Sequence, residues 1–184
     1  MQDTPRRTYA IRPARPEEFS RIGRLAAGAY ASLPGMPTTE EQPEYYGMLL
    51  DVAKRASNPA LQVIAAVSDS GEVLGCVDLI ADMKHYGSGG TARSVPEAAG
   101  MRLLAVDPGA RGMGLGKALT RFCIDRARAL GRSRLILHTT RAMETAWAMY
   151  EKLGFQRFPE IDFQQGKLEV FGFALKLEPR SNVG

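Results

Sequence analysis

The stretch VDPGARGMGLGKAL, residues 106–119, joins an apolar segment to a helical pattern. Gly112, Gly114 and Gly116 stand at alternate positions in it, where glycine permits unusual backbone dihedrals and the close approach of a ligand. The first N–H groups of the following helix would point into open space, with the positive end of the helix dipole behind them. Such a junction is suited to binding phosphate, and Arg111 adds a charged fork beside it.

Two nucleotide-binding patterns fail on this stretch. A dinucleotide fingerprint, G-x-G-x-x-G, requires a glycine at the position of Lys117. A P-loop requires a glycine at the position of Arg111, and a serine or threonine that would hold magnesium at the position of Ala118. A third pattern, [QR]-x-x-G-x-[GA], fits residues 111–116 at every fixed position.

This third pattern resembles the acyl-CoA-binding motif of the GNAT superfamily of N-acetyltransferases. A second GNAT pattern, N-x-x-A-x-x-x-Y-x-x-x-G-F, is expected one helix and one strand later. Ala146, Tyr150, Gly154 and Phe155 match it in register, whereas Met143 stands where the family has asparagine. The two coupled matches identify the chain as similar to GNAT proteins.

The order of elements agrees with this resemblance over residues 8–177. We expect strands at 8–13, 61–67, 72–81, 100–106, 134–139 and 167–177, and helices at 16–30, 43–56, 115–130 and 141–153. The expected fold is α/β (α+β): the resemblance implies a mixed, mostly antiparallel central sheet, splayed between two strands and flanked by helices. We expect one domain at 8–178, with flexible tails at 1–7 and 179–184.

Composition limits the function classes. Of the 184 residues, 45% are hydrophobic and 24% charged, which is ordinary for a globular domain. No segment approaches the roughly 20 apolar residues of a membrane span, and the N-terminus has no apolar run of signal-peptide length. The net charge of +4 comes from dispersed basic residues, which does not favour nucleic acid. We therefore expect a cytoplasmic protein with no membrane or nucleic-acid partner.

Cysteines and histidines are too few to predict a metal site. Cys76 and Cys123 are isolated within apolar patterns, as small core residues are. His85 and His138 are the only two histidines. We therefore expect no bound metal.

The GNAT resemblance implies acetyl-CoA as the cofactor and a ternary complex in which an amine attacks the thioester directly. It implies that the strands at 100–106 and 134–139 splay apart, that pantetheine lies in the gap, and that the glycine turn holds the pyrophosphate. The implied cofactor-binding residues are Leu104, Ala105, Val106, Arg111, Gly112, Met113, Gly114, Leu115, Gly116, Lys117, Met143 and Tyr150. Met143 can only pack, so one polar contact that the family asparagine makes is lost here.

Tyr150 stands where the family has its general acid. A phenol with a reference pKa of about 10 is protonated at neutral pH and can donate to the departing sulfur. The alternative is an ordinary helix tyrosine that packs on the sheet. The backbone N–H near Leu104 is expected to polarise the thioester carbonyl.

The general base is open. Many GNAT proteins carry a glutamate six residues before the position of Val106, but this chain has Gly100 there. Glu97 could act through water or a bulged strand. His138 occupies a position in the next strand where some relatives use a glutamate, and imidazole can accept an amine proton; it could equally be structural. An acceptor amine with a low pKa would need no strong base.

The acceptor site is expected between the first two helices, the 84–97 connection and the 158–167 loop. Its candidate lining residues are Tyr30, Tyr45, Tyr46, Tyr86 and Phe163, with Asp78 and Asp82 as acidic candidates. Amino acids, small-molecule amines and protein amines all remain open as acceptors.

The alternative interpretation is a non-catalytic acyl-CoA sensor on the same fold. A nucleotide-binding protein is a more distant alternative. A homodimer is expected from family habit, since the long final strand could pair or swap between copies.

Overall fold

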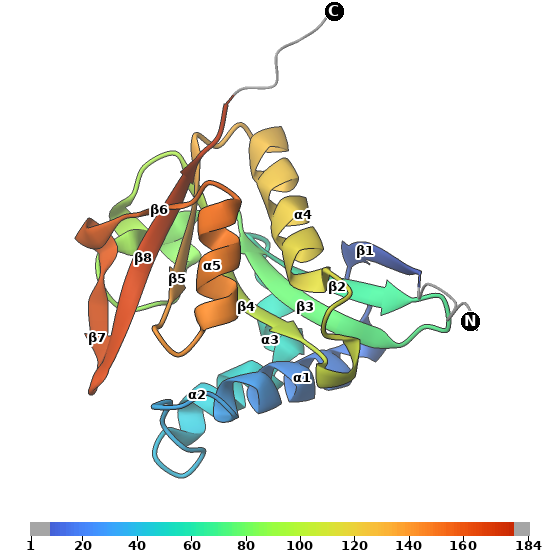
Figure 1. Cartoon of the computed structure of the whole chain (residues 1–184). Coiled ribbons are helices and arrows are strands. Elements are labelled where there is room, and N and C mark those ends of the chain that lie inside the picture. Colours follow the sequence, from blue (N-terminus) through green and yellow to red (C-terminus); the bar gives the residue numbers. More distant parts are fainter. Residues whose placement is uncertain (1–7, 179–184) are drawn as a thin grey trace, which may run out of the picture.

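One mixed sheet forms the centre of the computed structural model, which describes residues 8–178 (Figure 1). Its strand order is β1-β2-β3-β4-β5-β8-β6, and β7 pairs with β8 outside this path. The strands are β1 (Tyr9–Pro13), β2 (Leu61–Ser68), β3 (Val73–Ile80), β4 (Ala98–Val106), β5 (Arg134–Thr139), β6 (Gln156–Arg157), β7 (Phe163–Gln165) and β8 (Leu168–Lys176). The tails predicted at 1–7 and 179–184 lie outside the described residues.

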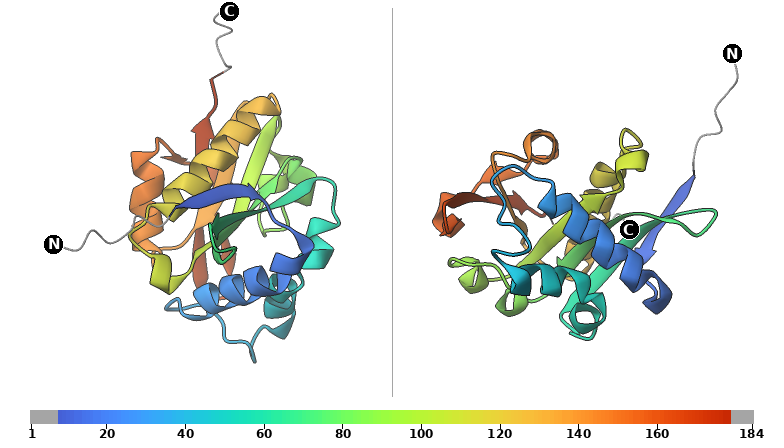
Figure 2. Two further views of the ribbon diagram at one scale, coloured as in Figure 1. Left: turned by 90° about the vertical axis from the view of Figure 1, so that its right-hand side faces the viewer. Right: turned by 90° about the horizontal axis from the view of Figure 1, so that it is seen from below.

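Helices cover both faces of the sheet (Figure 2). They are α1 (Phe19–Ala31), α2 (Pro43–Leu50), α3 (Val52–Ala56), α4 (Leu115–Ala129) and α5 (Glu144–Lys152). The side chains of β2 contribute to the core on both faces, because successive side chains of a strand point to opposite faces of the sheet. Ile64 and Ala66 join the core cluster under α4 and α5, whereas Val63, Ala65 and Val67 join the cluster under α1.

The sheet opens between β4 and β5, the one parallel pair of neighbours among the described strands. Their register runs only from Ala98 opposite Arg134 to Gly100 opposite Ile136. Beyond that point a β-bulge disturbs β4, where Leu103 has φ 57° and the register with β3 shifts. A bulge leaves its extra residue out of the ladder. The expected α/β fold, with a mostly antiparallel sheet splayed between two strands, is therefore confirmed.

Several element boundaries differ from the sequence prediction. The helix predicted at 43–56 is two helices, because Asp51 leaves the helical conformation and its carboxylate accepts from the N–H of Lys54 at 3.1 Å, which starts α3. The segment 158–167 was predicted as a loop, but it contains β7, which is too short and polar to show alternation. The strand predicted at 100–106 begins two residues earlier, at Ala98.

The long strand β8 is paired along its whole length within one chain, but on both sides only at Phe173 and Ala174. It lies between β5 and β6, and its first residues also pair with β7. The homodimer stays a prediction, and β8 has no free edge for it at Phe173 and Ala174. Within residues 8–178, no helix combines the length and the apolar character needed to cross a membrane.

Candidate active site

The turn between β4 and α4 is built around Asp107. Its backbone N–H donates to Leu74 O at 2.8 Å, which ties the end of β4 to β3, and its carboxylate accepts from the N–H of Gly109 at 2.8 Å. The chain then passes through Gly112 with φ 81° and Gly114 with φ 74°. These are left-handed conformations that side-chain-bearing residues rarely adopt, so glycine is required for the path of the turn.

The start of α4 fits an anionic ligand. Gly114 is its N-cap residue and supplies no side-chain hydrogen bond to the first turn, although α4 has 15 residues. Added Cβ atoms at Gly112 and Gly114 would meet nothing within 4 Å, so the space before the helix is open. Arg111 and Lys117 are exposed beside it. Free N–H groups, a positive dipole end and two cations suit a diphosphate.

The opened part of β4 has backbone groups to offer. Leu103 and Leu104 stand opposite the single residue Val77, outside the β3–β4 register, and the pairing with β5 has already ended at Gly100. Leu104 and Val106 are half-buried, whereas Ala105 packs inside. The backbone of this stretch is therefore open to the amides of an extended ligand arm, and its contact with pantetheine stays a prediction.

The other cofactor-binding candidates surround the same opening. Leu115 is buried and anchors the start of α4 in the core, and Met113 is half-buried against that core. A Cβ added at Gly116 would lie 3.6 Å from Met149 Sδ and 4.0 Å from Leu104 Cδ2. The first turn of α4, β4 and α5 therefore come together at Gly116.

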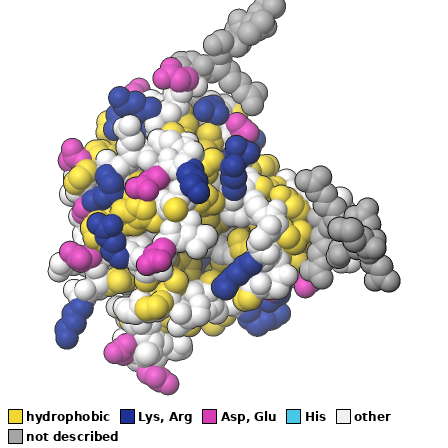
Figure 3. Space-filling view, in the orientation of Figure 1, with side chains coloured by type: hydrophobic (Ala, Val, Ile, Leu, Met, Phe, Trp, Pro, Cys, Tyr) yellow, Lys and Arg dark blue, Asp and Glu magenta, His cyan; other side chains and the backbone are white. Residues whose placement is uncertain are grey.

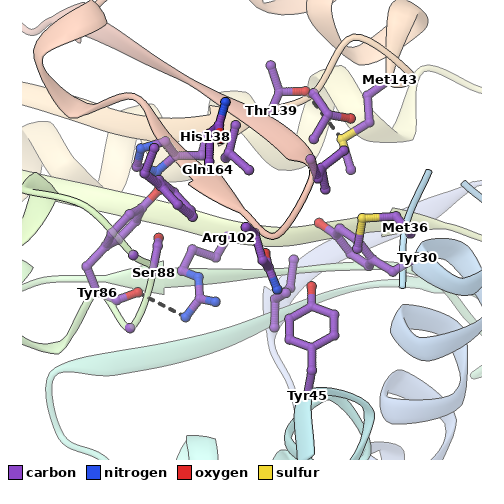
Figure 4. A pocket seen from close by; sticks show the side chains of 18 of the residues that line it. Tyr30, Met36, Tyr45, Tyr86, Ser88, Arg102, His138, Thr139, Met143 and Gln164 are labelled. Carbon is purple, nitrogen blue, oxygen red and sulfur yellow. Dashed lines mark hydrogen bonds between the residues drawn. The ribbon is translucent and has the colours of Figure 1, made fainter. Parts of the chain in front are cut away.

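A cavity of about 410 Å³ lies between the helices of the first third of the chain and the β7–β8 hairpin (Figure 4). This is the location expected for the acceptor, and its volume is in the usual range for small-molecule sites, about 300–1,000 Å³. Four of the five aromatic candidates line it. The residues that line it include Tyr30, Met36, Tyr45, Met48, Tyr86, Gly87, Arg102, His138, Thr140, Phe163, Leu168 and Val170.

The glycine turn, the split between β4 and β5 and the adjoining cavity lie in a fold that known proteins share. A model of the acetyltransferase (GNAT) family matches residues 28–155. The chain belongs to the GNAT family. The uncharacterized N-acetyltransferase YjgM of Escherichia coli K12 is 30% identical over 125 residues, which are 66% of this chain and 72% of YjgM. The structure of yncA from Salmonella typhimurium with its cofactor acetyl-CoA has a TM-score of 0.62 and 18% identity, and covers 96% of this chain and 98% of yncA.

A second kind of relative matches a shorter part of this GNAT chain. The mycothiol acetyltransferase of Beutenbergia cavernae is 46% identical over 63 residues, which are 33% of this chain and 21% of that protein. The chain therefore spans about a fifth of the length of the mycothiol acetyltransferases that it matches. Family membership confirms the resemblance found in the motifs.

Four of the candidates for the acceptor site and the general base do not reach the cavity of this GNAT protein. Tyr46 is buried and its hydroxyl donates to Pro37 O at 2.7 Å. Asp78 is buried in an ion pair with Arg55, with 2.8 Å from Oδ2 to Nε. Asp82 accepts from the N–H of Lys84 and so begins a short 3-10 turn. These side chains stabilise the fold rather than line the cavity, which sequence spacing alone does not reveal.

Glu97 is the fourth of these candidates. It is exposed at the start of β4, and its carbonyl accepts from the N–H of Ser133, just before β5. The two strands are paired there, so Glu97 lies at the opposite end of β4 from the glycine turn. The structure does not bring it together with the other site residues.

His138 does line the cavity, but both of its ring nitrogens are engaged. Nε2 lies 2.8 Å from Ile161 O, which can only accept, so the proton is assigned to Nε2. Nδ1 then accepts from the hydroxyl of Tyr86 at 3.0 Å. The Tyr86 ring occupies the space above Gly100, where an added Cβ would come within 2.5 Å of it. Tyr86 thus fills the position from which a family glutamate would extend.

We expect His138 to make the protein less stable in mild acid. Burial lowers the pKa of His138 below its usual 6.5. Above pH 6.5 the imidazole is neutral in both states; below it the unfolded chain takes up the proton first, so the free energy of unfolding falls until the folded-state pKa is passed. Tm measured from pH 8 to pH 5 should show this decline, and His138→Gln should reduce it.

The other histidine provides the control for this measurement. His85 is exposed on the 3-10 turn Met83–His85. His85→Gln should leave the decline of Tm in place. An equal decline in wild type and His138→Gln would contradict the assignment to His138.

Tyr150 belongs to the buried core cluster under α4 and α5 and is not part of the cavity lining, whereas Met143 is. Tyr150 is 5% exposed, and its ring packs edge-on against Phe155 at a centroid distance of 5.6 Å. No hydrogen bond joins its hydroxyl to another residue of 8–178, and burial raises its pKa. Met143 lines the cavity, where its sulfur accepts from the Thr139 hydroxyl at 3.3 Å. The role of Met143 toward the cofactor stays a prediction.

Sequence reasoning missed several polar residues of the cavity, and two of them, Arg102 and Thr140, matter most for its chemistry. Arg102 projects into it from β4 (Figure 4). Thr140, which follows the last residue of β5, also lines it. A signal for Arg102 was present: it is the only charged residue within the apolar run GMRLLAV, residues 100–106. No comparable signal marks Thr140.

Proposed function

We propose that the protein transfers the acetyl group of acetyl-CoA to the amine of a small acceptor bound in the cavity beside the β4–β5 opening. The observation that carries this proposal is the junction of three features at one place: the uncapped start of α4, the unpaired stretch of β4 and the cavity. Gly112, Gly114, Gly116 and Lys117 would hold the pyrophosphate through their amides. Arg111 adds charge beside them.

Acetyl-CoA supplies an acetyl group activated as a thioester. The lone pair of the neutral amine forms the new C–N bond, and the C–S bond breaks. The N–H near Leu104 stabilises the oxyanion, and the Tyr150 hydroxyl gives its proton to the leaving sulfur. Tyr150 recovers a proton through solvent as the amine nitrogen loses one, so the enzyme ends unchanged.

The amine proton has no obvious protein acceptor. His138 could take it only if Tyr86 released Nδ1, and Glu97 is remote from the cavity. We therefore propose that the acceptor enters as the neutral amine and that water carries the proton away. His138 then acts as a positioning residue for Tyr86.

Ligand-dependent unfolding tests the cofactor. Acetyl-CoA or CoA at about 100 times its Kd should add roughly 2.7 kcal/mol, which is about 5–10 °C in Tm for a domain of this size. ATP and NADH should not shift Tm. Acetyl transfer is then tested by measuring the free thiol of CoA that is released when acetyl-CoA is incubated with the protein and each of a panel of amines.

The outcomes separate the candidates. A shift with acetyl-CoA but no thiol release with any amine would favour a non-catalytic acyl-CoA sensor. Two observations favour that alternative: Gly100 stands where many family members have a glutamate, and both ring nitrogens of His138 are already hydrogen-bonded. A shift with ATP or NADH alone would overturn the assignment of the glycine turn to CoA.

A further inference from the structure

Arg102 is a cation without a carboxylate partner in the described part of the chain. It lies opposite Asp78 in the β3–β4 register, but Asp78 is already paired with Arg55. None of the five ion pairs among residues 8–178 includes Arg102. The lining of the cavity contains no aspartate or glutamate. The cavity therefore carries one permanent positive charge that the described residues leave unbalanced.

The guanidinium of Arg102 is held in place with donors to spare. Nη1 donates to Tyr86 O at 2.9 Å, and the group lies 5.7 Å from the centre of the Tyr86 ring. Gly87 permits this approach, since a Cβ there would lie 2.6 Å from Nη1. A guanidinium has five N–H donors, and one hydrogen bond to the described residues uses one of them. The remaining donors are available to a ligand.

Further donors enter the same cavity (Figure 4). The Tyr30 and Tyr45 side chains approach it from α1 and from α2. Burial raises the pKa of both phenols, so they stay protonated and can donate to an anion. Thr140 also lines the cavity; it is 5% exposed, and its Oγ1 has no hydrogen-bond partner among residues 8–178. A buried hydroxyl without a partner is unfavourable unless a ligand supplies one.

We propose that the acceptor is a small amine that also bears a carboxylate and an apolar side chain, as an apolar amino acid does. The carboxylate binds the fork of Arg102, a geometry that the guanidinium favours. The apolar part packs against Met36, Met48, Phe163, Leu168 and Val170. A single guanidinium among neutral hydroxyls balances one negative charge, which suits a carboxylate better than a phosphate. This inference rests on the acetyl transfer proposed above.

The same charge excludes the opposite class of acceptor. A polyamine would bring several positive charges to Arg102 and would find no acidic side chain in the lining. Spermine should therefore be a poor acceptor. The cavity selects against it by repulsion as well as by lack of partners.

Four amines test the proposal: L-leucine, L-leucinamide, 3-methylbutylamine and spermine. Wild-type kcat/KM should be about 100-fold higher for leucine than for the two matched amines that lack a carboxylate. Arg102→Gln should lower kcat/KM for leucine about 100-fold and leave kcat/KM for leucinamide nearly unchanged, so that the preference for leucine disappears. Arg102→Lys keeps the positive charge but lacks the two parallel N–H donors of the guanidinium. It should lower kcat/KM for leucine about tenfold.

Arg134→Gln is the matched control. Arg134 is a half-buried arginine on the neighbouring strand β5; it lies over the Phe158 ring at 5.9 Å and is outside the cavity lining. Its substitution should leave the leucine preference intact. The rise of Tm with CoA should persist in all three variants, which shows that they fold and bind cofactor.

A binding measurement separates failure of this inference from failure of the proposed function. Leucine is titrated calorimetrically into the CoA-saturated protein, where no transfer can occur. Leucine that binds through Arg102 without being acetylated would support the carboxylate site and overturn acetyl transfer to it. Transfer to leucinamide or spermine as efficient as to leucine, unaffected by Arg102→Gln, would overturn the carboxylate site and leave acetyl transfer standing. Absence of leucine binding in wild type also overturns the inference.

Discussion

Tyr150→Phe should lower kcat for acetyl transfer by about 100- to 1,000-fold, because a positioned proton donor contributes on that order. The loss should be in kcat, with KM for acetyl-CoA nearly unchanged, since the hydroxyl acts on the thiolate that forms in the transition state. Steady-state kinetics with saturating acceptor measures both values.

Tyr150→Phe should remove the hydroxyl without disturbing the fold. The Tyr150 hydroxyl has no hydrogen bond to another described residue, and phenylalanine keeps the ring that packs on Phe155. The free energy of unfolding should therefore stay within about 0.5 kcal/mol of wild type, and the rise of Tm with acetyl-CoA should be retained. Burial raises the pKa of Tyr150, so the wild-type rate should not fall through loss of this proton below about pH 10. Transfer by Tyr150→Phe within twofold of wild type would remove Tyr150 as the acid.

The parts of the site that depend on local backbone were predictable from sequence. The glycines between an apolar strand and an amphipathic helix specify a turn whose dihedrals only glycine adopts readily, and the structure has Gly112 and Gly114 at positive φ. The start of α4 at Leu115 follows from the same local pattern. Such features need no knowledge of distant residues.

The parts that depend on long-range pairing were not predictable. Asp78 looked like a candidate for binding a cationic acceptor until the fold placed Arg55 against it from α3. That pairing is also what leaves Arg102 without a partner. Gly100 looked like the loss of a glutamate, but the ring of Tyr86 fills its space, which no local pattern shows. Strand alternation indicates which face a side chain takes but does not identify what meets it there.

Gly114→Asp should weaken acetyl-CoA binding by about 100-fold, equivalent to about 2.7 kcal/mol. Gly114 is the N-cap of α4 in a left-handed conformation, with open space where a side chain would extend. Aspartate tolerates that conformation better than most residues and is a favourable N-cap. Its carboxylate would bond the free N–H groups of the first turn and repel the diphosphate. Titration of acetyl-CoA by fluorescence or calorimetry gives the Kd.

Gly114→Asn separates charge from shape. Asparagine has nearly the same size, tolerates the left-handed conformation and caps helices equally well, but it is neutral. It should weaken acetyl-CoA binding by only about tenfold, because it competes for the N–H groups without repelling the anion. Both ligand-free variants should unfold within a few degrees of wild type, so lost binding is not lost folding. Equal Kd values for the two variants at low and at high salt would show that the negative charge of the diphosphate is not what the N-terminus of α4 binds. The glycine turn would then need another role.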